Sequence, residues 1–563
     1  MEKNLLRIGF RTPPLVGGSG SRALMATPVT PTLTSLTMAV PSQPTPACPR
    51  PAHRSGTTPH LETLGVSRRS VMGGMMGLGA ASLTLGSGAA KGQGKNGAPP
   101  MVRDELVTLM HHATQGFTLD ELARAEAMGY GAWLDEQLDP ASIDDSAMDQ
   151  ILAGLPNLPL SAQEIWNING PPNNTTAGLL RELRSATILR SMMSKRQLYE
   201  RLVEFWSDHF NILQNEDSLQ RILKMVDDRT AVRANVLTAQ GTFHDLLLAN
   251  AQGASMSYYL DNYASKAGSI NENYARELME LHTLGVSGPY TETDVTEVAR
   301  CFTGWAFLPP QSGSLGDFVF IPNRHDNGAK TVLGQTIPAG GGINDGLTVL
   351  SILATHPSTV RRISRKLASW LLRVDPPSSV MLRVENAYRS TGGNIRAMVS
   401  AILQPETFLE AAPWKEPKLK RPFHLLVSLL RQTEPQFSNM VGVINALAAM
   451  GHAPHDWHTP DGAPDRIESW GGDVLNRWTL ASYLLSNQLP GVTVPNSSIG
   501  MILGGVPQSQ VVRRLDQVLC GGTMRSEDRD LLQSYVDGLS SWNVTSAREA
   551  IALAASSPSY QLY

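Results

Sequence analysis

An apolar repeat with the period of an α-helix is the feature that most constrains this fold, and it recurs along most of the sequence after residue 103. It is clearest at 358–373, where the apolar side chains on one helical face are Val360, Ile363, Leu367, Trp370 and Leu371. The opposite side carries the cations Arg361, Arg362, Arg365 and Lys366. A helix with one apolar face must bury it against other elements, so the pattern predicts a packed multi-helical body.

The same periodicity predicts helices elsewhere in the chain. The other segments in which we expect helices are 104–112, 119–137, 179–192, 195–206, 271–285, 292–302, 380–390, 394–403, 421–431, 440–449, 474–485 and 543–555. The predicted fold class is therefore mainly α. We expect residues 103–563 to form a single large helical domain, built as one body or as two lobes.

One segment, near 318–333, departs from the helical pattern. Residues 318–321 are aromatic and β-branched, which favours a strand. Asn327-Gly328 is a dipeptide typical of hairpin turns, and 331–333 could return as the partner strand. The sequence therefore predicts a small β-hairpin inserted in the helical body.

The N-terminal region is expected to lie outside the folded domain. Residues 1–66 are rich in Pro, Thr and Ser, which indicates a disordered extension or a start codon assigned too far upstream. Arg68 and Arg69 precede an uncharged Gly- and Ala-rich stretch, so 67–90 resembles a twin-arginine signal peptide. A linker is expected at 91–102. These features predict an exported protein in the periplasm or outside the cell.

Composition excludes several classes of protein. Charged residues make up 17% and the net charge is −3, so a strongly basic nucleic-acid binder is not expected. No stretch after residue 90 approaches 18 apolar residues, so we expect no transmembrane helix in the mature chain. Removing residues 1–90 takes away eight Lys/Arg and two Asp/Glu, which changes the formal charge to −9. Cys301 and Cys520 would then be the remaining cysteines, either paired or buried separately.

Several segments together resemble one bacterial family. The hallmark motif is NENYARELMELHTLGV at 271–286, followed by Thr303-Gly304-Trp305. Others are FWSDHFNI at 205–212, HPSTVRRISRKLASWLL at 356–372 and TGGNIRAMVSAIL at 391–403. These motifs resemble domain-of-unknown-function family 1800, over about residues 104–563. The resemblance assigns no activity, but it implies a co-exported partner of the alkaline-phosphatase-like fold.

A metal centre is the leading hypothesis for the site. Glu277 and Glu280 are three residues apart and share a helical face, as carboxylate ligands on one helix do. With His209, His325 and Asp326 they would form an oxygen and imidazole set suited to a divalent transition metal such as Zn, Mn or Fe. Such a metal could activate a water, with a spare Glu as general base. This predicts a metal-dependent hydrolase acting on an extracytoplasmic polymer or conjugate.

The same residues allow other interpretations. Glu272, Arg276 and Glu280 are spaced four apart and could form only a surface ion-pair ladder. Glu280 with Asp294 or Glu297 could instead be the acid and base of a glycan-cleaving enzyme. In that case, the aromatic residues available to stack on sugars are Trp305, Trp457 and Trp470.

A non-enzymatic function also remains open. The protein could be a binding or assembly protein that works with a co-exported partner. The cationic face of the 358–373 helix could bind an anionic polymer, or it could simply be a solvated helix face.

Overall fold

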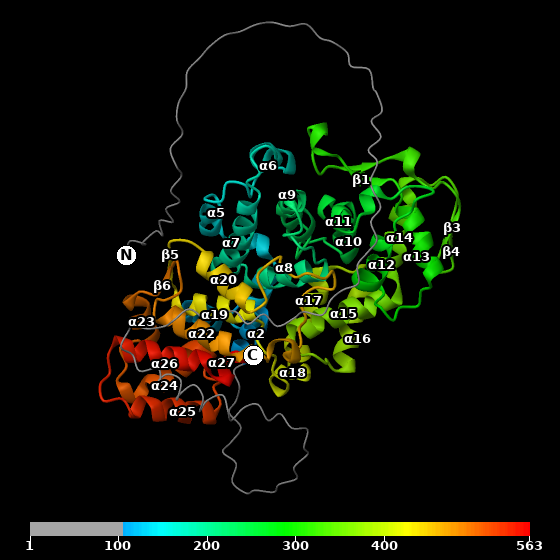
Figure 1. Ribbon diagram of the computed structural model, residues 1–563. Coiled ribbons are helices and arrows are strands. Elements are labelled where there is room, and N and C mark those ends of the chain that lie inside the picture. The colour runs from blue at the N-terminus through cyan, green and yellow to red at the C-terminus, as the bar shows by residue number, and fades with distance from the viewer. Residues whose placement is uncertain (1–104) are drawn as a thin grey trace, which may run out of the picture.

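Helices dominate residues 105–563, the part of the chain that this computed structural model describes (Figure 1). The predicted extension (1–66), signal peptide (67–90) and linker (91–102) lie outside the described residues. The helices up to the middle of the chain are α2 (Glu105–Ala113), α3 (Leu119–Met128), α4 (Tyr130–Leu138), α5 (Ser146–Leu152), α6 (Ala162–Asn169), α7 (Ala177–Met193), α8 (Gln197–His209), α9 (Ser218–Asp227), α10 (Phe243–Gln252), α11 (Ala254–Tyr259), α12 (Asn273–Glu277) and α13 (Glu292–Phe302).

Further helices form the second half of the chain and confirm the mainly α fold class. They are α14 (Ile343–Thr355), α15 (Pro357–Leu371), α16 (Ser378–Thr391), α17 (Ile395–Leu403), α18 (Pro405–Ala411), α19 (Pro422–Thr433), α20 (Val441–Ala449), α21 (Ile467–Trp470), α22 (Val474–Leu485), α23 (Asn496–Leu503), α24 (Val511–Cys520), α25 (Ser526–Asp537), α26 (Val544–Ser556) and α27 (Pro558–Gln561). No helix within residues 105–563 has the length and apolarity needed to cross a membrane.

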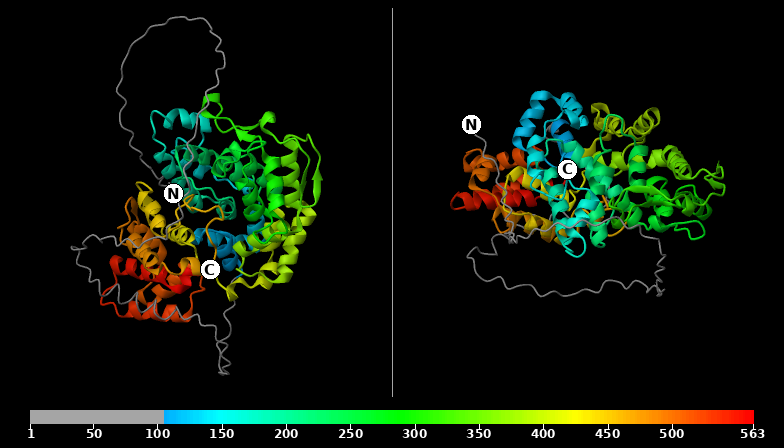
Figure 2. Two further views of the ribbon diagram at one scale, coloured as in Figure 1. Left: turned by 45° about the vertical axis from the view of Figure 1, so that its right-hand side comes forward. Right: turned by 90° about the horizontal axis from the view of Figure 1, so that it is seen from above.

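The apolar core consists of two large clusters and one small one. The first large cluster draws on α2–α4, α8 and α10–α18, and the second on α5, α7, α19, α20 and α22–α27. The small cluster lies mainly between α6, α7 and α9. The two large clusters occupy different sides of the molecule, with the orange and red helices α22–α27 far from the green α13 and α14 (Figures 1 and 2). Neither large cluster is built from one continuous segment of the chain.

Helix α15 packs as the apolar repeat predicts. Its apolar side chains are almost completely buried, with Ile363, Leu367 and Leu371 fully inaccessible to solvent. They lie in the first core cluster, where α15 contacts α14, α16 and α17. Burying a side chain of this size contributes roughly 1.5–3 kcal/mol, so the position of the helix is strongly determined. Its cationic side faces away from that core.

The strand region contains two hairpins rather than the one that the sequence predicted. β1 (Trp305–Phe307) pairs with β2 (Phe318–Phe320), and β3 (Lys330–Val332) pairs with β4 (Gln335–Ile337), both antiparallel. The predicted pairing of 318–321 with 331–333 was therefore wrong, although both segments are strands. The tight turn is Leu333-Gly334, where both residues have positive φ, as a type I′ turn needs. A third short pair joins β5 (Gln436–Phe437) to β6 (Val492–Thr493).

The helix predicted at 271–285 is α-helical only in its first part. After α12 the chain forms a π-helix, η4 (Leu278–Thr283). A π-helix is wider than an α-helix, so the α-helical spacing assumed for Glu277 and Glu280 does not hold across this segment. A second difference lies at 119–137, where Gly129 adopts a positive φ and separates α3 from α4.

Both cysteines in the described residues are free. Cys301 and Cys520 are each buried, and burial raises the pKa of each thiol to about 12. Of the two alternatives that the sequence left open, separate burial is the one observed.

A glycine on α14 gives a direct test of this packing. A methyl group at Gly346 would lie 2.6 Å from Cζ2 of the buried Trp305. Gly346→Ala should therefore lower the free energy of unfolding by about 1–3 kcal/mol, measured by urea unfolding. Gly178 on α7 is the matched control because a methyl group there has nothing within 4 Å. Gly178→Ala should be neutral or stabilise by up to about 1 kcal/mol. Equal losses in both variants would contradict this packing.

Candidate functional site

His209, a predicted metal ligand, has both ring nitrogens engaged within the protein. It is the last residue of α8 and is buried. Its Nε2 lies 3.1 Å from the backbone oxygen of His282, and its Nδ1 lies 2.8 Å from Nζ of Lys366. A carbonyl only accepts, so Nε2 carries the proton and Nδ1 accepts from the lysine. Burial, followed by the charge of Lys366, holds the pKa of His209 well below its usual range, so the ring is neutral.

His325 and Asp326 are held by other partners. The Nδ1 of His325 lies 2.8 Å from the Thr303 backbone oxygen, and its Nε2 lies 3.1 Å from Oδ2 of Asp345. Asp326 forms an ion pair with Arg300 at 2.8 Å. The hydrogen bond from Arg300 lowers the pKa of Asp326 to about 2. These contacts tie the segment that precedes β3 to α13 and α14, and they give both side chains a structural role.

The ion-pair ladder that the sequence offered as an alternative is present. Arg276 lies 3.7 Å from a carboxylate oxygen of Glu272 and 3.6 Å from one of Glu280. Glu277 is half-buried, and burial, reinforced by the charge of Glu280, raises its pKa. Glu280 is thus part of a partly exposed ladder, and Glu277 lies beside it.

The acid and base predicted for glycan cleavage also have structural partners. Asp294 caps α13 through Thr291 and accepts a hydrogen bond from the backbone N–H of Leu333 at 2.8 Å. Glu297 accepts from Arg300 at 2.8 Å. Trp305 is buried within an aromatic cluster and is not available to a sugar.

The structure does not gather the five predicted metal ligands. In residues 105–563, the one group of three ligand-type side chains whose atoms lie within 4.8 Å of one another is Glu204, Asp208 and His452. Arg421 already occupies its centre. Its Nη2 lies 2.6 Å from Oδ2 of Asp208, 3.3 Å from Oε1 of Glu204 and 2.7 Å from Nε2 of His452. A guanidinium therefore holds these carboxylates where a cation would bind.

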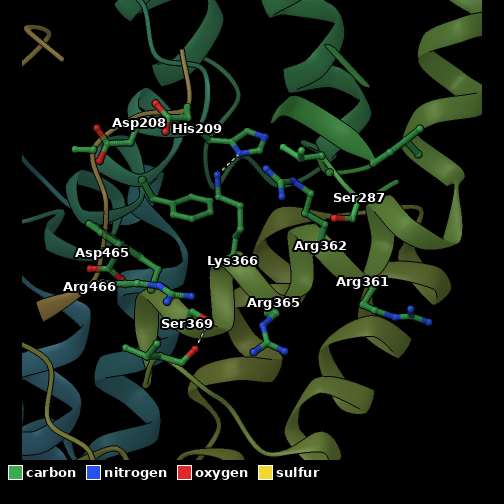
Figure 3. Close-up of a pocket in the computed structure, with 18 of the residues that line it drawn as sticks. Asp208, His209, Ser287, Arg361, Arg362, Arg365, Lys366, Ser369, Asp465 and Arg466 are labelled. Atoms are coloured by element: carbon green, nitrogen blue, oxygen red, sulfur yellow. Dashed lines mark hydrogen bonds between the residues drawn. The ribbon is translucent and has the colours of Figure 1, made fainter. Parts of the chain in front are cut away.

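Beside this cluster lies a pocket with a volume of about 650 Å³ (Figure 3). One wall is the cationic side of α15. A second wall is the loop at 284–288 that follows η4, and a third is the loop at 461–466. In Figure 3, Lys366 extends from α15 to His209, and Arg362 lies beside it.

The pocket holds more cations than its carboxylates can neutralise. Three of its acidic side chains already have partners. Asp208 binds Arg421 and Asp375 lies 2.5 Å from Arg365, both of which also line the pocket, and Asp465 binds Lys418. Asp461 accepts a hydrogen bond from the Thr459 hydroxyl. Among residues 105–563, no carboxylate lies within ion-pair distance of the remaining cations, which are Arg361, Arg362, Lys366 and Arg466.

Two of these cations are poorly solvated as well as unpaired. Arg362 donates from Nη2 to the Leu281 backbone oxygen at 3.1 Å, while its buried Nε has no hydrogen-bond partner. Burial lowers its pKa. Burial, and then the charge of Arg362, lowers the pKa of Lys366 to about 7. Across the pocket, burial raises the pKa of Asp208 to about 6.

Sequence reasoning found one wall of this pocket and missed the others. The cations at 361–366 were recognised, and binding of an anion was one of two interpretations of them. The loops at 284–288 and 461–466 are far from α15 in sequence and have no pattern that predicts their approach. The signal that could have drawn attention to one of them is a pair of glycines, Gly285 near the end of the family motif and Gly288 just after it.

Comparison with known proteins gives the family. A family model described as "Protein of unknown function (DUF1800)" matches residues 108–562. The chain belongs to the DUF1800 family. This confirms the resemblance seen in the sequence. No curated protein and no solved structure matches this DUF1800 protein.

The guanidinium in the carboxylate cluster has a testable consequence for stability. Arg421→Gln would leave Glu204 and Asp208 beside each other without a cation, so it should lower the free energy of unfolding at pH 7 by about 3–5 kcal/mol. Arg383→Gln is the control because Arg383 is paired with Glu410 at an exposed site on α16, and it should cost less than about 1 kcal/mol. Losses of similar size in the two variants would contradict the central role of Arg421.

Proposed function

We propose that this DUF1800 protein binds an anionic ligand in the pocket formed by α15, 284–288 and 461–466. The observation that carries the proposal is the group of unpaired cations on the pocket wall. Arg362 and Lys366 both have lowered pKa values, which means that their charged forms are poorly stabilised. An anion in the pocket would supply the missing charge.

The residue types favour an oxyanion such as a phosphate or a carboxylate. Arginine presents a planar set of donors that matches both groups. Hydroxyl donors are also at hand, because Ser287 and Ser358 line the pocket. A volume of about 650 Å³ is in the range of sites for small molecules. The aromatic side chains of Phe205 and Trp370 give the ligand an apolar surface next to the cations.

Of the hypotheses raised by the sequence, this proposal develops the binding alternative. A metal-dependent hydrolase would need a ligand set, and His209, His325 and Asp326 are each committed to other contacts. The glycan alternative would need free carboxylates, whereas Asp294 and Glu297 are hydrogen-bonded within the fold. We retain export as part of the proposal because of the twin-arginine pattern at 67–90. The ligand would then be an extracytoplasmic anion or an anionic group on a larger partner.

Calorimetry with simple oxyanions tests this function. Inorganic phosphate and pyrophosphate should bind the full chain, and Arg362→Gln should weaken binding at least about tenfold because a charge-assisted hydrogen bond is lost. Arg389→Gln on α16 is the control, since Arg389 is paired with Glu385 outside the pocket. The Arg389→Gln variant should bind both anions with the affinity of the wild-type protein. Absence of binding at millimolar concentrations, or equal weakening in both variants, would refute the proposal.

A further inference from the structure

Lys366 occupies an unusual position among the cations of the pocket. Its Nζ lies 2.8 Å from Nδ1 of the neutral His209 and 5.9 Å from the centre of the Phe205 ring. The side chain is half-buried, yet no carboxylate within residues 105–563 forms an ion pair with it. Buried lysines are ordinarily paired with an acid, as Lys330 is with Asp345 at 2.6 Å. Lys366 therefore has a hydrogen-bond acceptor but no counter-ion.

The charges around Lys366 come from every element packed against it. The groups that face it are Arg362 on α15, Asp208 and His209 on α8, His282 on η4 and Asp461 in the 461–466 loop. Arg362 opposes the ammonium form, and the two histidines are neutral because burial lowers the pKa of each. Asp208 is committed to Arg421. The surroundings thus favour a neutral amine next to a cationic pocket.

We propose that Lys366 is a nucleophile that forms a Schiff base with an aldehyde or ketone carrying an anionic group. The inference rests on the proposed function, because Arg361 and Arg362 would hold the anionic group while the carbonyl reaches Nζ. A lysine that is desolvated next to another cation is one of the ways in which an amine is activated as a nucleophile. The lowered pKa of Lys366, which burial and Arg362 cause, agrees with the activation that this position predicts.

The reaction balances without an external oxidant or reductant. The neutral amine of Lys366 attacks the carbonyl carbon, so that the C–N bond forms as the π bond of the carbonyl breaks. One proton passes from the nitrogen to the oxygen to give a neutral carbinolamine. A second proton reaches the hydroxyl, water leaves, and the nitrogen lone pair forms the C=N bond. The sum is amine plus carbonyl plus one proton, giving a protonated imine and water. The proton that Lys366 must lose beforehand passes to solvent in the pocket, because the low pKa of His209 makes its ring too weak a base to take it.

Reductive trapping with two probes tests the proposal. Pyridoxal 5′-phosphate is an anionic aldehyde, and pyridoxal is the same aldehyde without the phosphate. The full chain is incubated with each probe near pH 7.5, reduced with borohydride and mapped by peptide mass spectrometry. Lys366 should be labelled by pyridoxal 5′-phosphate at least about tenfold faster than Lys266, an exposed lysine outside the pocket. Labelling of Lys366 no faster than Lys266 would overturn the inference.

The pH profile and two variants separate reactivity from a structural role. The rate of labelling at Lys366 should rise through pH of about 7, since the neutral amine accumulates above its pKa. Lys366→Arg keeps the charge and should abolish labelling at this position. Arg362→Gln retains the nucleophile and should remove the preference for pyridoxal 5′-phosphate over pyridoxal, so it tests the idea even if Lys366→Arg does not fold.

Failure of this inference can be told apart from failure of the proposed function. If phosphate binds but Lys366 is inert, the nucleophile is refuted and anion binding stands. If Lys366 reacts rapidly with both probes and phosphate does not protect it, the nucleophile is supported and anion binding is refuted.

Discussion

The burial of one face of α15 is the interaction on which the pocket depends. Ile363, Leu367 and Leu371 are inaccessible to solvent and lie in the largest core cluster, so the helix cannot rotate without exposing them. Arg362 directly precedes Ile363 and Lys366 directly precedes Leu367, so both cations are thereby fixed on the side that faces 284–288 and 461–466. The hydrophobic effect places these cations at a cost to their own hydration, and their lowered pKa values reflect that cost.

The neighbouring carboxylates do not neutralise this charge because another arginine holds them. Arg421 contacts Glu204 and Asp208 at the edge of the pocket. Arg365 and Lys418 likewise hold Asp375 and Asp465. The pocket therefore keeps a local excess of positive charge, although we expect the mature chain to carry a net negative charge. Local segregation of charge of this kind is what attracts and orients an anion.

The apolar repeat was sufficient to predict about half of the helices, because burial of one face depends on local spacing, but it missed others such as α14, α24 and α25. It could not predict the pairing of the strands, since the turn at Leu333-Gly334 competes with the stronger signal at Asn327-Gly328. The predicted metal ligands share suitable residue types, but residue type alone does not show which side chains come together in the fold. His209 binds Lys366 and Asp326 binds Arg300, contacts between segments far apart in sequence. The cations of the pocket were visible in the sequence, whereas their lack of partners was not.

The most direct test of an anion-binding pocket on α15 is to locate an anion in it. Crystals of the full chain soaked in selenate, and measured at the selenium edge, should show an anomalous peak within hydrogen-bonding distance of the side chains of Arg362 and Lys366. Competition with phosphate should remove that peak. A pocket without a peak, in crystals where selenate binds elsewhere on the molecule, would contradict the account.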